Sequence, residues 1–406
     1  MKELVLMAPT QIKPEQSPAN LYNWTIVDFY SKVKRLQGVI VNTPLIWNIN
    51  GLKFIQMLKE AEVKKDSKSI EDFIGKCIDK THEQLKEYGL DFDLEIRDDK
   101  IRLDDLLNGD YAQIIKQGKV ETKICSFCEL SFGTDPQISK CRKCGMNLSC
   151  VESDNLFQDI KKIDIMNKID KINFFPFSLK NRLIDFANTL PEEYKLLISK
   201  QREYTLEYNG FKLDPRFVAI MTFPILLHNN NYDHKTVIHG DVMKKLDYYL
   251  TCHLISHDLP STIVSHGPCL GPDKKKLRWQ NLDKDSFKLL QKIPKKILRC
   301  YFLKHNIFKG ITINPNEFET QLIHPTDIYI KLNKMLKKDN SKDKNHISVD
   351  ETRNSFYQFV NKFEFPRAFG LFEETVNNLW NNTKYDCISK DEKIWLEDLK
   401  KLYFGA

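Results

Sequence analysis

The stretch "ELVLMAPTQIKPEQSPANLYNWTIVDFYSKVKRLQGVIV" (residues 3–41) decides the expected fold. It contains an apolar strand, a loop marked by prolines, an amphipathic helix and the start of a second strand. The apolar stripe of the helix consists of Leu21, Trp24, Val27, Tyr30 and Val33. Strand, helix and strand in this order predict a parallel sheet with a phosphate-binding corner at the helix start. The loop nevertheless has no glycine and no histidine, and Lys13 is its one cation.

The same alternation continues on both sides of a cysteine-rich segment. The apolar run "VIVNTPLIW" (39–47) predicts a strand, and "SIEDFIGKCIDKTHEQLKEYG" (69–89) predicts a helix that ends in a cap at Gly89. Further strand signals are "TVIHGDV" (236–242) and "STIVSHGP" (261–268). From about residue 286 onward the pattern is almost wholly helical. The expected fold class is therefore α/β with a helical C-terminal part.

Length and composition set limits on the class of protein. The 406 residues are 41% hydrophobic and 29% charged, which is ordinary for a globular protein of two or three domains. The sequence has no apolar run long enough for a membrane span, and its first apolar run is too short for a signal peptide. Ten cysteines without an export signal favour metal ligation over disulfides. We therefore expect a cytoplasmic protein.

Four cysteines have the spacing of a structural metal site. The segment "CSFCELSFGTDPQISKCRKC" (125–144) places two C-x2-C pairs twelve residues apart, with the cysteines Cys125, Cys128, Cys141 and Cys144. Each pair can bring two thiolates to one ion from a tight turn, so the four predict a closed tetrahedral zinc site without catalytic function. A chance cluster or two disulfides are the alternative. Cys150 lies outside this spacing and is expected to be a bystander.

The order of these parts resembles methionyl-tRNA synthetase, a class I aminoacyl-tRNA synthetase, over nearly the whole chain. "VDFYSKVKRLQG" (27–38) is similar to the helix after the first family signature, with Asp28 and Arg35 in place. "THEQLKEYGLDFDLEIRDD" (81–99) and "STIVSHGPCLGP" (261–272) are similar to later family segments. The resemblance implies a Rossmann-like class I synthetase catalytic domain with a CxxC zinc-knuckle insert and a C-terminal α-helical bundle.

The resemblance also implies domain boundaries. We expect the first half of the Rossmann-like domain in residues 1–120 and the zinc knuckle in 121–155. The second half of the domain is expected in 156–285. A helical domain similar to an anticodon-binding domain is expected in 286–406.

The residues that bind ATP in the family are largely replaced. The H-x-G-H signature aligns with Ser17, Pro18, Ala19 and Asn20, so both histidines are lost. The K-M-S-K-S loop aligns with Lys275, Lys276, Leu277, Arg278 and Trp279, which keep basic groups but no serine. Phe223 replaces a polar position, and Asp241 is retained on the adenosine side. The remnants of the nucleotide site are Asn20, Asp241, Lys275, Lys276 and Arg278, and their context argues against ATP binding.

The amino-acid and anticodon sites are altered as well. An acid that would pair with the substrate ammonium is replaced by Asn48. The anticodon motif N-L-A-S-R aligns with a segment from Lys334 to Lys338, in which lysines can bind phosphate but read base edges poorly. The expected RNA-binding residues are Lys334, Lys337, Lys338 and Trp380. The lysines equally fit a solvated face, and Trp380 fits the core.

Together these losses favour a protein that no longer forms methionyl-adenylate. We expect a methionyl-tRNA-synthetase-like pseudoenzyme that is retained as a tRNA- or RNA-binding accessory factor, with tRNA, other RNA or a protein as partner and neither DNA nor a membrane. One alternative is an active ATP-dependent ligase with a rebuilt site that uses Lys275, Lys276 and Arg278. The other is a structural subunit of a protein complex. Histidines such as His239, His253 and His266 are interpreted as structural hydrogen-bonding groups.

Overall fold

The computed structural model describes most of the chain. Its described residues are 1–49, 52–100, 115–127, 139–141, 144–199, 207–214, 231–240, 259–271, 274, 277, 292–338, 340–341, 346–382 and 387–405. Within them, no helix is both long enough and apolar enough to cross a membrane.

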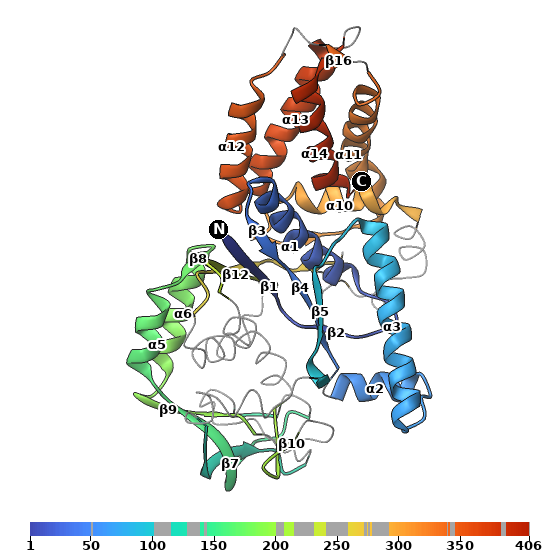
Figure 1. The fold of residues 1–406 in the computed structure, drawn as a ribbon. Helices are drawn as coiled ribbons and strands as arrows, with labels where there is room; N and C mark the ends of the chain where they lie inside the picture. Colours follow the sequence, from blue (N-terminus) through green and yellow to red (C-terminus); the bar gives the residue numbers. More distant parts are fainter. Residues whose placement is uncertain are drawn as a thin grey trace.

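A five-stranded parallel sheet forms the centre of the molecule (Figure 1). Its order is β3-β1-β12-β13-β8, and the strands are β1 (Lys2–Met7), β3 (Ile40–Asn42), β8 (Asn173–Phe175), β12 (His234–Gly240) and β13 (Thr262–His266). The sheet therefore joins strands from both sides of the cysteine-rich segment. This arrangement confirms the predicted α/β class with a parallel sheet.

The opening strand and helix fold as predicted. Helix α1 (Pro18–Leu36) follows β1 and a short strand β2 (Thr10–Gln11), and it buries more than the predicted stripe. Thr25, Asp28 and Ser31 are also fully buried, because α1 lies between the sheet and the helical part of the molecule. Ser17 is the N-cap, and Pro18 occupies the first turn, where a proline is tolerated.

The apolar run 39–47 forms two strands in different sheets, where one was predicted. β3 joins the central sheet, whereas β4 (Pro44–Asn48) lies in a small parallel sheet of order β2-β4-β5 with β5 (Leu94–Arg97). The chain changes sheet at Thr43, whose N–H donates to the Asp93 carboxylate at 2.7 Å. Pro44 has no N–H to extend the first pairing.

Helices and a 3-10 turn cover this first half. They are α2 (Leu52–Glu60), α3 (Ser67–Tyr88) and η1 (Asp98–Lys100). Asp66 caps the start of α3 by accepting from the Ser69 N–H, and Gly89 ends it in the left-handed conformation at φ 62°. The predicted glycine cap is confirmed.

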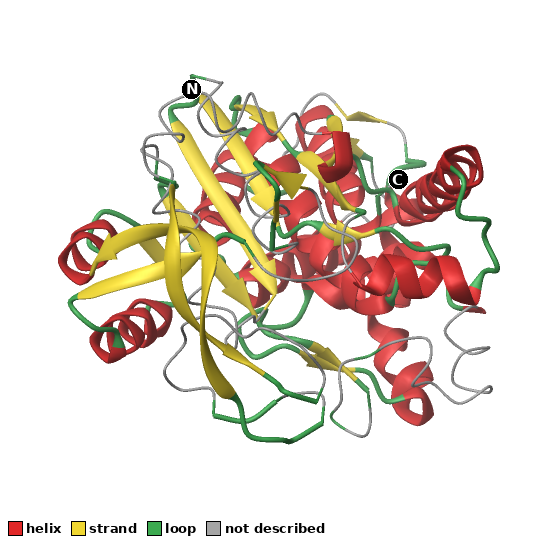
Figure 2. Ribbon diagram, turned by 90° about the horizontal axis from the view of Figure 1, so that it is seen from below, coloured by secondary structure: helices red, strands yellow, loops and turns green. Residues whose placement is uncertain are grey.

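A long antiparallel ribbon carries the cysteine-rich segment. β6 (Lys116–Ile124) and β7 (Ser149–Lys161) form nine cross-strand pairs, and β9 (Glu193–Leu197) pairs with β7 on its other side. This lobe lies at the opposite end of the molecule from the helical bundle (Figure 1). Helices α5 (Lys162–Ile169) and α6 (Ser178–Thr189) connect it to the central sheet. Figure 2 shows helices on both sides of the strands.

The C-terminal part is a helical bundle, as predicted. Its helices are α10 (Lys295–Leu303), α11 (Pro315–Met335), α12 (Val349–Asn361), α13 (Phe365–Asn382) and α14 (Lys390–Phe404). The remaining strands are the short pairs β10 (Glu207–Tyr208) with β11 (Phe211–Lys212), β14 (Cys269–Leu270) with β15 (Ile311–Thr312), and β16 (Asn340–Ser341) with β17 (Ile388–Ser389). The bundle shares one apolar core with α1 and β1, so it is fixed to the sheet and not attached by a free linker.

Candidate functional site

The segment that aligns with the H-x-G-H signature is buried at the start of α1. Ser17 and Ala19 are 4% and 7% exposed, Pro18 is buried, and Asn20 is half-buried. Pro18 contributes no N–H at the helix start, where backbone N–H groups would otherwise bind an anion. The helix also has a neutral first turn. This corner therefore keeps the shape of a phosphate site but presents few donors to a ligand.

Side-chain amides hold the corner together. Asn20 Nδ2 donates to Gln16 Oε1 at 2.7 Å, and the Gln16 N–H donates to Gln84 Oε1 of α3 at 3.0 Å. Gln16 itself is completely buried. The Asn20 amide, which was predicted to be a remnant of the nucleotide site, is thus engaged within the protein. Sequence reasoning missed Gln16 and Gln84, which lie 68 positions apart and have no shared motif.

A half-buried cation lies near this corner, on the side of the helical bundle. Lys295 at the start of α10 is half-buried, and burial lowers its pKa while the carboxylates of Glu87 and Glu15 raise it. Glu15 belongs to the loop before α1. Burial raises the pKa of Glu15, and Lys295 lowers it. The charge of Lys295 is therefore balanced by acids of the protein.

Two histidines lie at the carboxyl ends of β12 and β13, the edge where ligands bind in open α/β sheets. His266 Nε2 lies 2.6 Å from Asn23 Oδ1 of α1, and its Nδ1 lies 2.8 Å from the Gly267 carbonyl. His239 Nδ1 lies 3.0 Å from the Gly240 carbonyl. Both rings are buried, at 3% and 2% exposure. These contacts agree with the structural role predicted for His239 and His266, while His253 and Asp241 lie outside the described residues.

The loop that aligns with K-M-S-K-S is anchored at its centre. Leu277 is 1% exposed, and its N–H donates to the Cys269 carbonyl of β14 at 2.8 Å. The position aligned with a small serine therefore belongs to the apolar core. Lys275, Lys276, Arg278 and Trp279 lie outside the described residues, as does Phe223.

Asn48 ends β4 beside the corner. Its carbonyl accepts the Ile12 N–H at 3.2 Å, and its side chain is half-buried. The neighbouring Trp47 is fully buried and donates from Nε1 to Glu95 Oε2 at 3.1 Å. The backbone here is part of the β2-β4-β5 sheet. A role of Asn48 in amino-acid binding stays a prediction.

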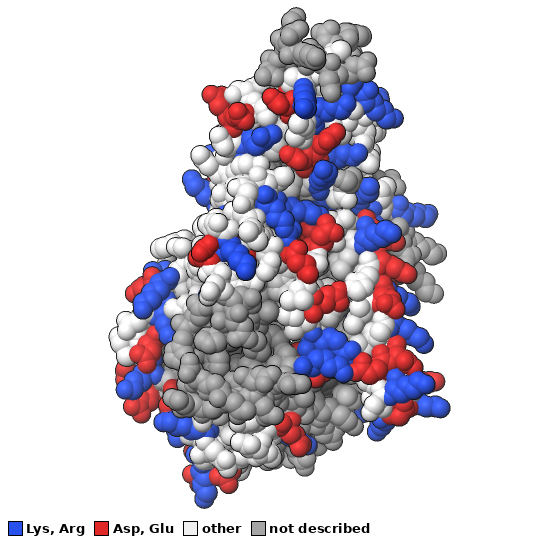
Figure 3. Space-filling view, viewed as in Figure 1, with Lys and Arg blue, Asp and Glu red and all other residues white. Residues whose placement is uncertain are grey.

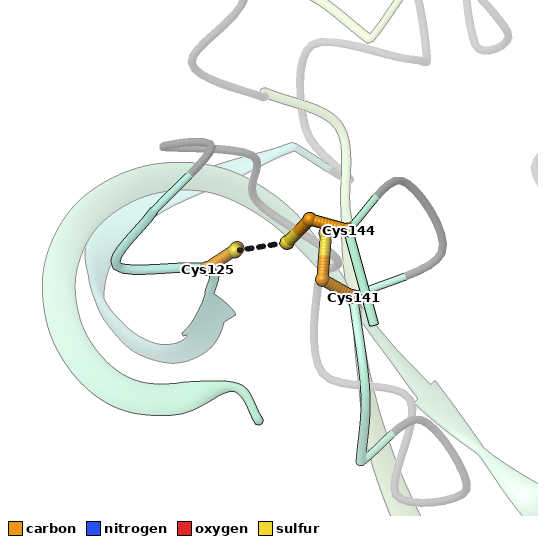
Figure 4. Close-up of side chains that lie close together, drawn as sticks. All are labelled: Cys125, Cys141 and Cys144. Atoms are coloured by element: carbon orange, nitrogen blue, oxygen red, sulfur yellow. Dashed lines mark hydrogen bonds between the residues drawn. The ribbon is translucent and has the colours of Figure 1, made fainter. Parts of the chain in front are cut away.

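Three of the four predicted metal ligands converge at the tip of the β6–β7 ribbon. The Sγ atoms of Cys125, Cys141 and Cys144 all lie within 4.8 Å of one another (Figure 4). Cys125 and Cys141 are buried, whereas Cys144 is half-buried. Gly145 permits the second turn with φ 77°, and its N–H donates to the Cys141 carbonyl at 2.8 Å. Cys128 lies outside the described residues.

The spacing of these sulfur atoms fits a metal ion. Cys125 Sγ and Cys144 Sγ are 3.5 Å apart, far beyond the roughly 2.05 Å of a disulfide. Thiolates that surround zinc tetrahedrally at about 2.3 Å from the ion stand about 3.8 Å from one another. The cluster could therefore hold a metal ion. Cys150 is exposed on β7 and lies outside the cluster, as the spacing predicted.

The predicted RNA-binding residues belong to the helical bundle, where they lie on α11, directly after α11 and on α13. Lys334 is exposed on α11, with its Nζ 5.8 Å from the centre of the half-buried Trp380 ring of α13. Lys337 is also exposed, but the Nζ of Lys338 is buried. Basic side chains gather over this part of the molecule in the space-filling view, with acidic ones among them (Figure 3). Their role in RNA binding stays a prediction.

A buried ion pair joins the helical bundle to the sheet. Arg299 of α10 and Asp28 of α1 are both completely buried, and Arg299 Nη2 lies 2.6 Å from Asp28 Oδ2. Arg299 also donates to the Leu402 carbonyl of α14 from Nε and Nη2, at 3.0 and 2.8 Å. The sequence indicated only that Asp28 is retained, because its partner lies 271 positions away.

Solved structures of class I aminoacyl-tRNA synthetases are similar to this chain along nearly its whole length. The Mycobacterium tuberculosis methionyl-tRNA synthetase bound by methionyl-adenylate has a TM-score of 0.71 at 12% identity, and the similarity covers 99% of this chain and 89% of that chain. Its free form has a TM-score of 0.64 at 11% identity, covering 99% and 86%. LeuRS from Agrobacterium radiobacter K84, in a ternary complex with tRNA and LeuAMS, has a TM-score of 0.72 at 10% identity, covering 98% and 82%.

Comparison of the sequence alone gives a different result from comparison of the structures. The sequence matches no protein-family model and no curated protein. At identities of 10 to 12%, the structural similarity establishes the fold. It confirms the resemblance that the order of motifs indicated. The chain has the fold of the class I aminoacyl-tRNA synthetases, with methionyl-tRNA synthetase among its structural neighbours.

Proposed function

We propose that this protein is a synthetase-fold accessory factor that binds tRNA and does not form an aminoacyl-adenylate. The observation that carries the proposal is the burial of the α1 start, where Ser17, Pro18 and Ala19 replace the signature residues and are covered. Asn20 is only half-buried, but its side-chain amide donates a hydrogen bond to Gln16 Oε1. A nucleotide phosphate needs exposed donors at this place.

The chemistry of adenylate formation makes the loss severe. Donors must stabilise the negative charge that develops on the phosphoryl group, and removal of one such donor typically costs about 10²–10³ in rate. Here both signature histidines are absent from the sequence, and the aligned loop serine is the buried Leu277. These changes act on the same transition state, so they need not add, but even two of them reduce the rate toward background.

Retention of the helical bundle supports a tRNA partner. One structural neighbour is described in complex with tRNA, and this chain has a net charge of +7. Lys334 and Lys337 are exposed on and just after α11, where they can neutralise phosphates. We further propose that Cys128 completes the cysteine cluster around a structural zinc ion and that the protein acts in the cytoplasm.

Two measurements test the proposal. In ATP–pyrophosphate exchange with each of the twenty amino acids, we expect a flat response, and exchange above background with any of them would favour the rebuilt ligase. In filter binding with total tRNA, we expect saturable binding whose affinity falls as salt rises. Binding that is absent or independent of salt would exclude the tRNA part and favour a structural subunit.

A further inference from the structure

We propose that the tip of the β6–β7 ribbon, beside the cysteine cluster, is a base-stacking site. There Phe127 and Met146 hold an unpaired base of single-stranded RNA, and Lys140 contacts its phosphate. The proposal rests on the proposed RNA function but adds a second, separate contact. This tip lies at the opposite end of the molecule from the helical bundle that carries Lys334 (Figure 1).

The two apolar side chains are exposed close in sequence to two of the clustered cysteines. Phe127 is 77% exposed and lies two residues after Cys125, while Met146 is 53% exposed and lies two residues after Cys144. The Sγ atoms of Cys125 and Cys144 are 3.5 Å apart. The backbone segments that carry Phe127 and Met146 therefore both lie close to the place that a metal ion would occupy. A metal ion would fix the two turns, so little conformational freedom would be lost when a base binds.

The ribbon that carries the tip projects from the molecule. Residues Ser149 to Glu152 of β7 are all exposed, whereas Thr122 on the paired strand β6 is buried, so the ribbon is open to solvent along β7 at this end. The second turn is closed by a hydrogen bond from the Cys141 N–H to the Met146 carbonyl at 2.7 Å and by a bridge between Lys140 and Asn147. Met146 is therefore held next to the exposed Lys140.

The size of the apolar surface favours a base over a protein. A large aromatic side chain offers about 150–250 Å², so Phe127 and Met146 together present roughly 200–300 Å². A stable protein interface needs about 800 Å² on each partner. A single base needs much less, and stacking on an aromatic ring contributes about 1–3 kcal/mol for each base regardless of sequence. An aromatic ring with a neighbouring cation is the usual arrangement for this purpose.

The test uses the zinc-loaded full chain and a fluorescent oligoadenylate of about eight nucleotides, a length typical of single-strand sites. Binding is measured by fluorescence anisotropy at several salt concentrations for the wild type, Phe127→Ala, Phe127→Trp and Lys140→Ala. The matched control is Phe177→Ala, because Phe177 is 70% exposed at the start of α6, away from the cysteines. Zinc content shows that each variant keeps the lobe folded.

We expect Phe127→Ala to bind roughly tenfold more weakly, Phe127→Trp to bind as the wild type, and Phe177→Ala to be unchanged. Phe127→Ala should leave the salt dependence intact, since stacking releases no counterions, whereas Lys140→Ala should reduce its slope. Equal affinities of the wild type and Phe127→Ala would overturn the proposal, as would an equal loss in Phe177→Ala.

Total tRNA measured in parallel separates the two proposals. If tRNA binds but the oligoadenylate does not, the stacking site is excluded and the proposed function stands. If the oligoadenylate binds through Phe127 but tRNA does not, the stacking site stands and the tRNA function fails. Tight capture of a protein at the tip, abolished by Phe127→Ala and without RNA binding, would also overturn the stacking site.

Discussion

Arg299 Nη2 lies 2.6 Å from Asp28 Oδ2, and both side chains are fully buried. The pair joins α1 to α10, and Asp28 also accepts the Asp91 N–H at 2.9 Å and contacts Lys32 at 3.1 Å. Arg299 in turn binds the Leu402 carbonyl. One ion pair therefore connects the first helix of the sheet domain with the last helix of the bundle.

Replacing Arg299 by Met should destabilise the protein by about 3–5 kcal/mol, because Asp28 would keep a buried charge without its arginine partner. The free energy of unfolding from urea denaturation measures this change. Lys116→Met is the control, since its pair with Asp159 is 59% and 42% exposed and should contribute little to stability. Equal effects of the two variants would contradict a structural role of the buried pair.

Gly89→Ala should destabilise strongly, whereas Gly75→Ala in the same helix should not. Gly89 has φ 62°, where a side chain costs about 1–2 kcal/mol, and an added Cβ would lie 2.2 Å from the Gly405 carbonyl oxygen. At Gly75 no atom lies within 4 Å of such a Cβ, so alanine should stabilise α3 by up to about 1 kcal/mol. The thermal unfolding midpoints of both variants test this prediction. An unchanged midpoint in Gly89→Ala would show that the end of α3 can move away from Gly405.

Cys125→Ser should abolish stoichiometric zinc binding, and Cys150→Ser should not. Cys125 is completely buried within the sulfur cluster, while Cys150 is exposed on β7. The first readout is the zinc content of the purified protein. The second is limited proteolysis, because residues 121–155 should become sensitive to protease when the ion is lost or chelated. Retention of one zinc ion per chain by Cys125→Ser would contradict the assignment.

His305 should make the protein less stable as the solution becomes acidic. Burial, together with the nearby charge of Lys304, lowers the pKa of His305 to about 4. Between about pH 6.5, the ordinary value, and pH 4, the unfolded chain binds a proton that the folded chain does not, so stability falls as pH falls through this window. His305→Gln should flatten that slope by about one proton in urea titrations at several pH values. An unchanged slope would assign the acid sensitivity to other groups.

The sequence predicted those parts of the structure that depend on local pattern or on motif order. Gly89 was found because a glycine ends an apolar helical repeat, and three of the four cysteines were found together because their spacing reflects the chemistry of one ion. The order of segments predicted the synthetase fold. The run 39–47 was predicted as one strand because periodicity does not show to which sheet a residue belongs.

Contacts between distant positions could not be predicted in this way. Nothing near Gln16 indicates that Gln84 will accept its N–H, and nothing near Asp28 indicates Arg299. The pairing of Gly89 with Gly405 is of the same kind, since each glycine alone only predicts a helix end. These contacts follow from how α1, α3, α10 and α14 pack, which requires coordinates.

The contact between Gly405 and Gly89 also has a consequence for synthesis. An added Cβ on Gly405 would lie 2.7 Å from the Gly89 Cα, and the neighbouring Leu402 carbonyl is an acceptor for Arg299. The sheet domain is made first, and one side of α1 packs against α10, α12 and α14 of the bundle. We therefore expect this side of α1 to gain its full apolar cover only after α14 has been synthesised, so the sheet domain and the bundle should complete their packing together.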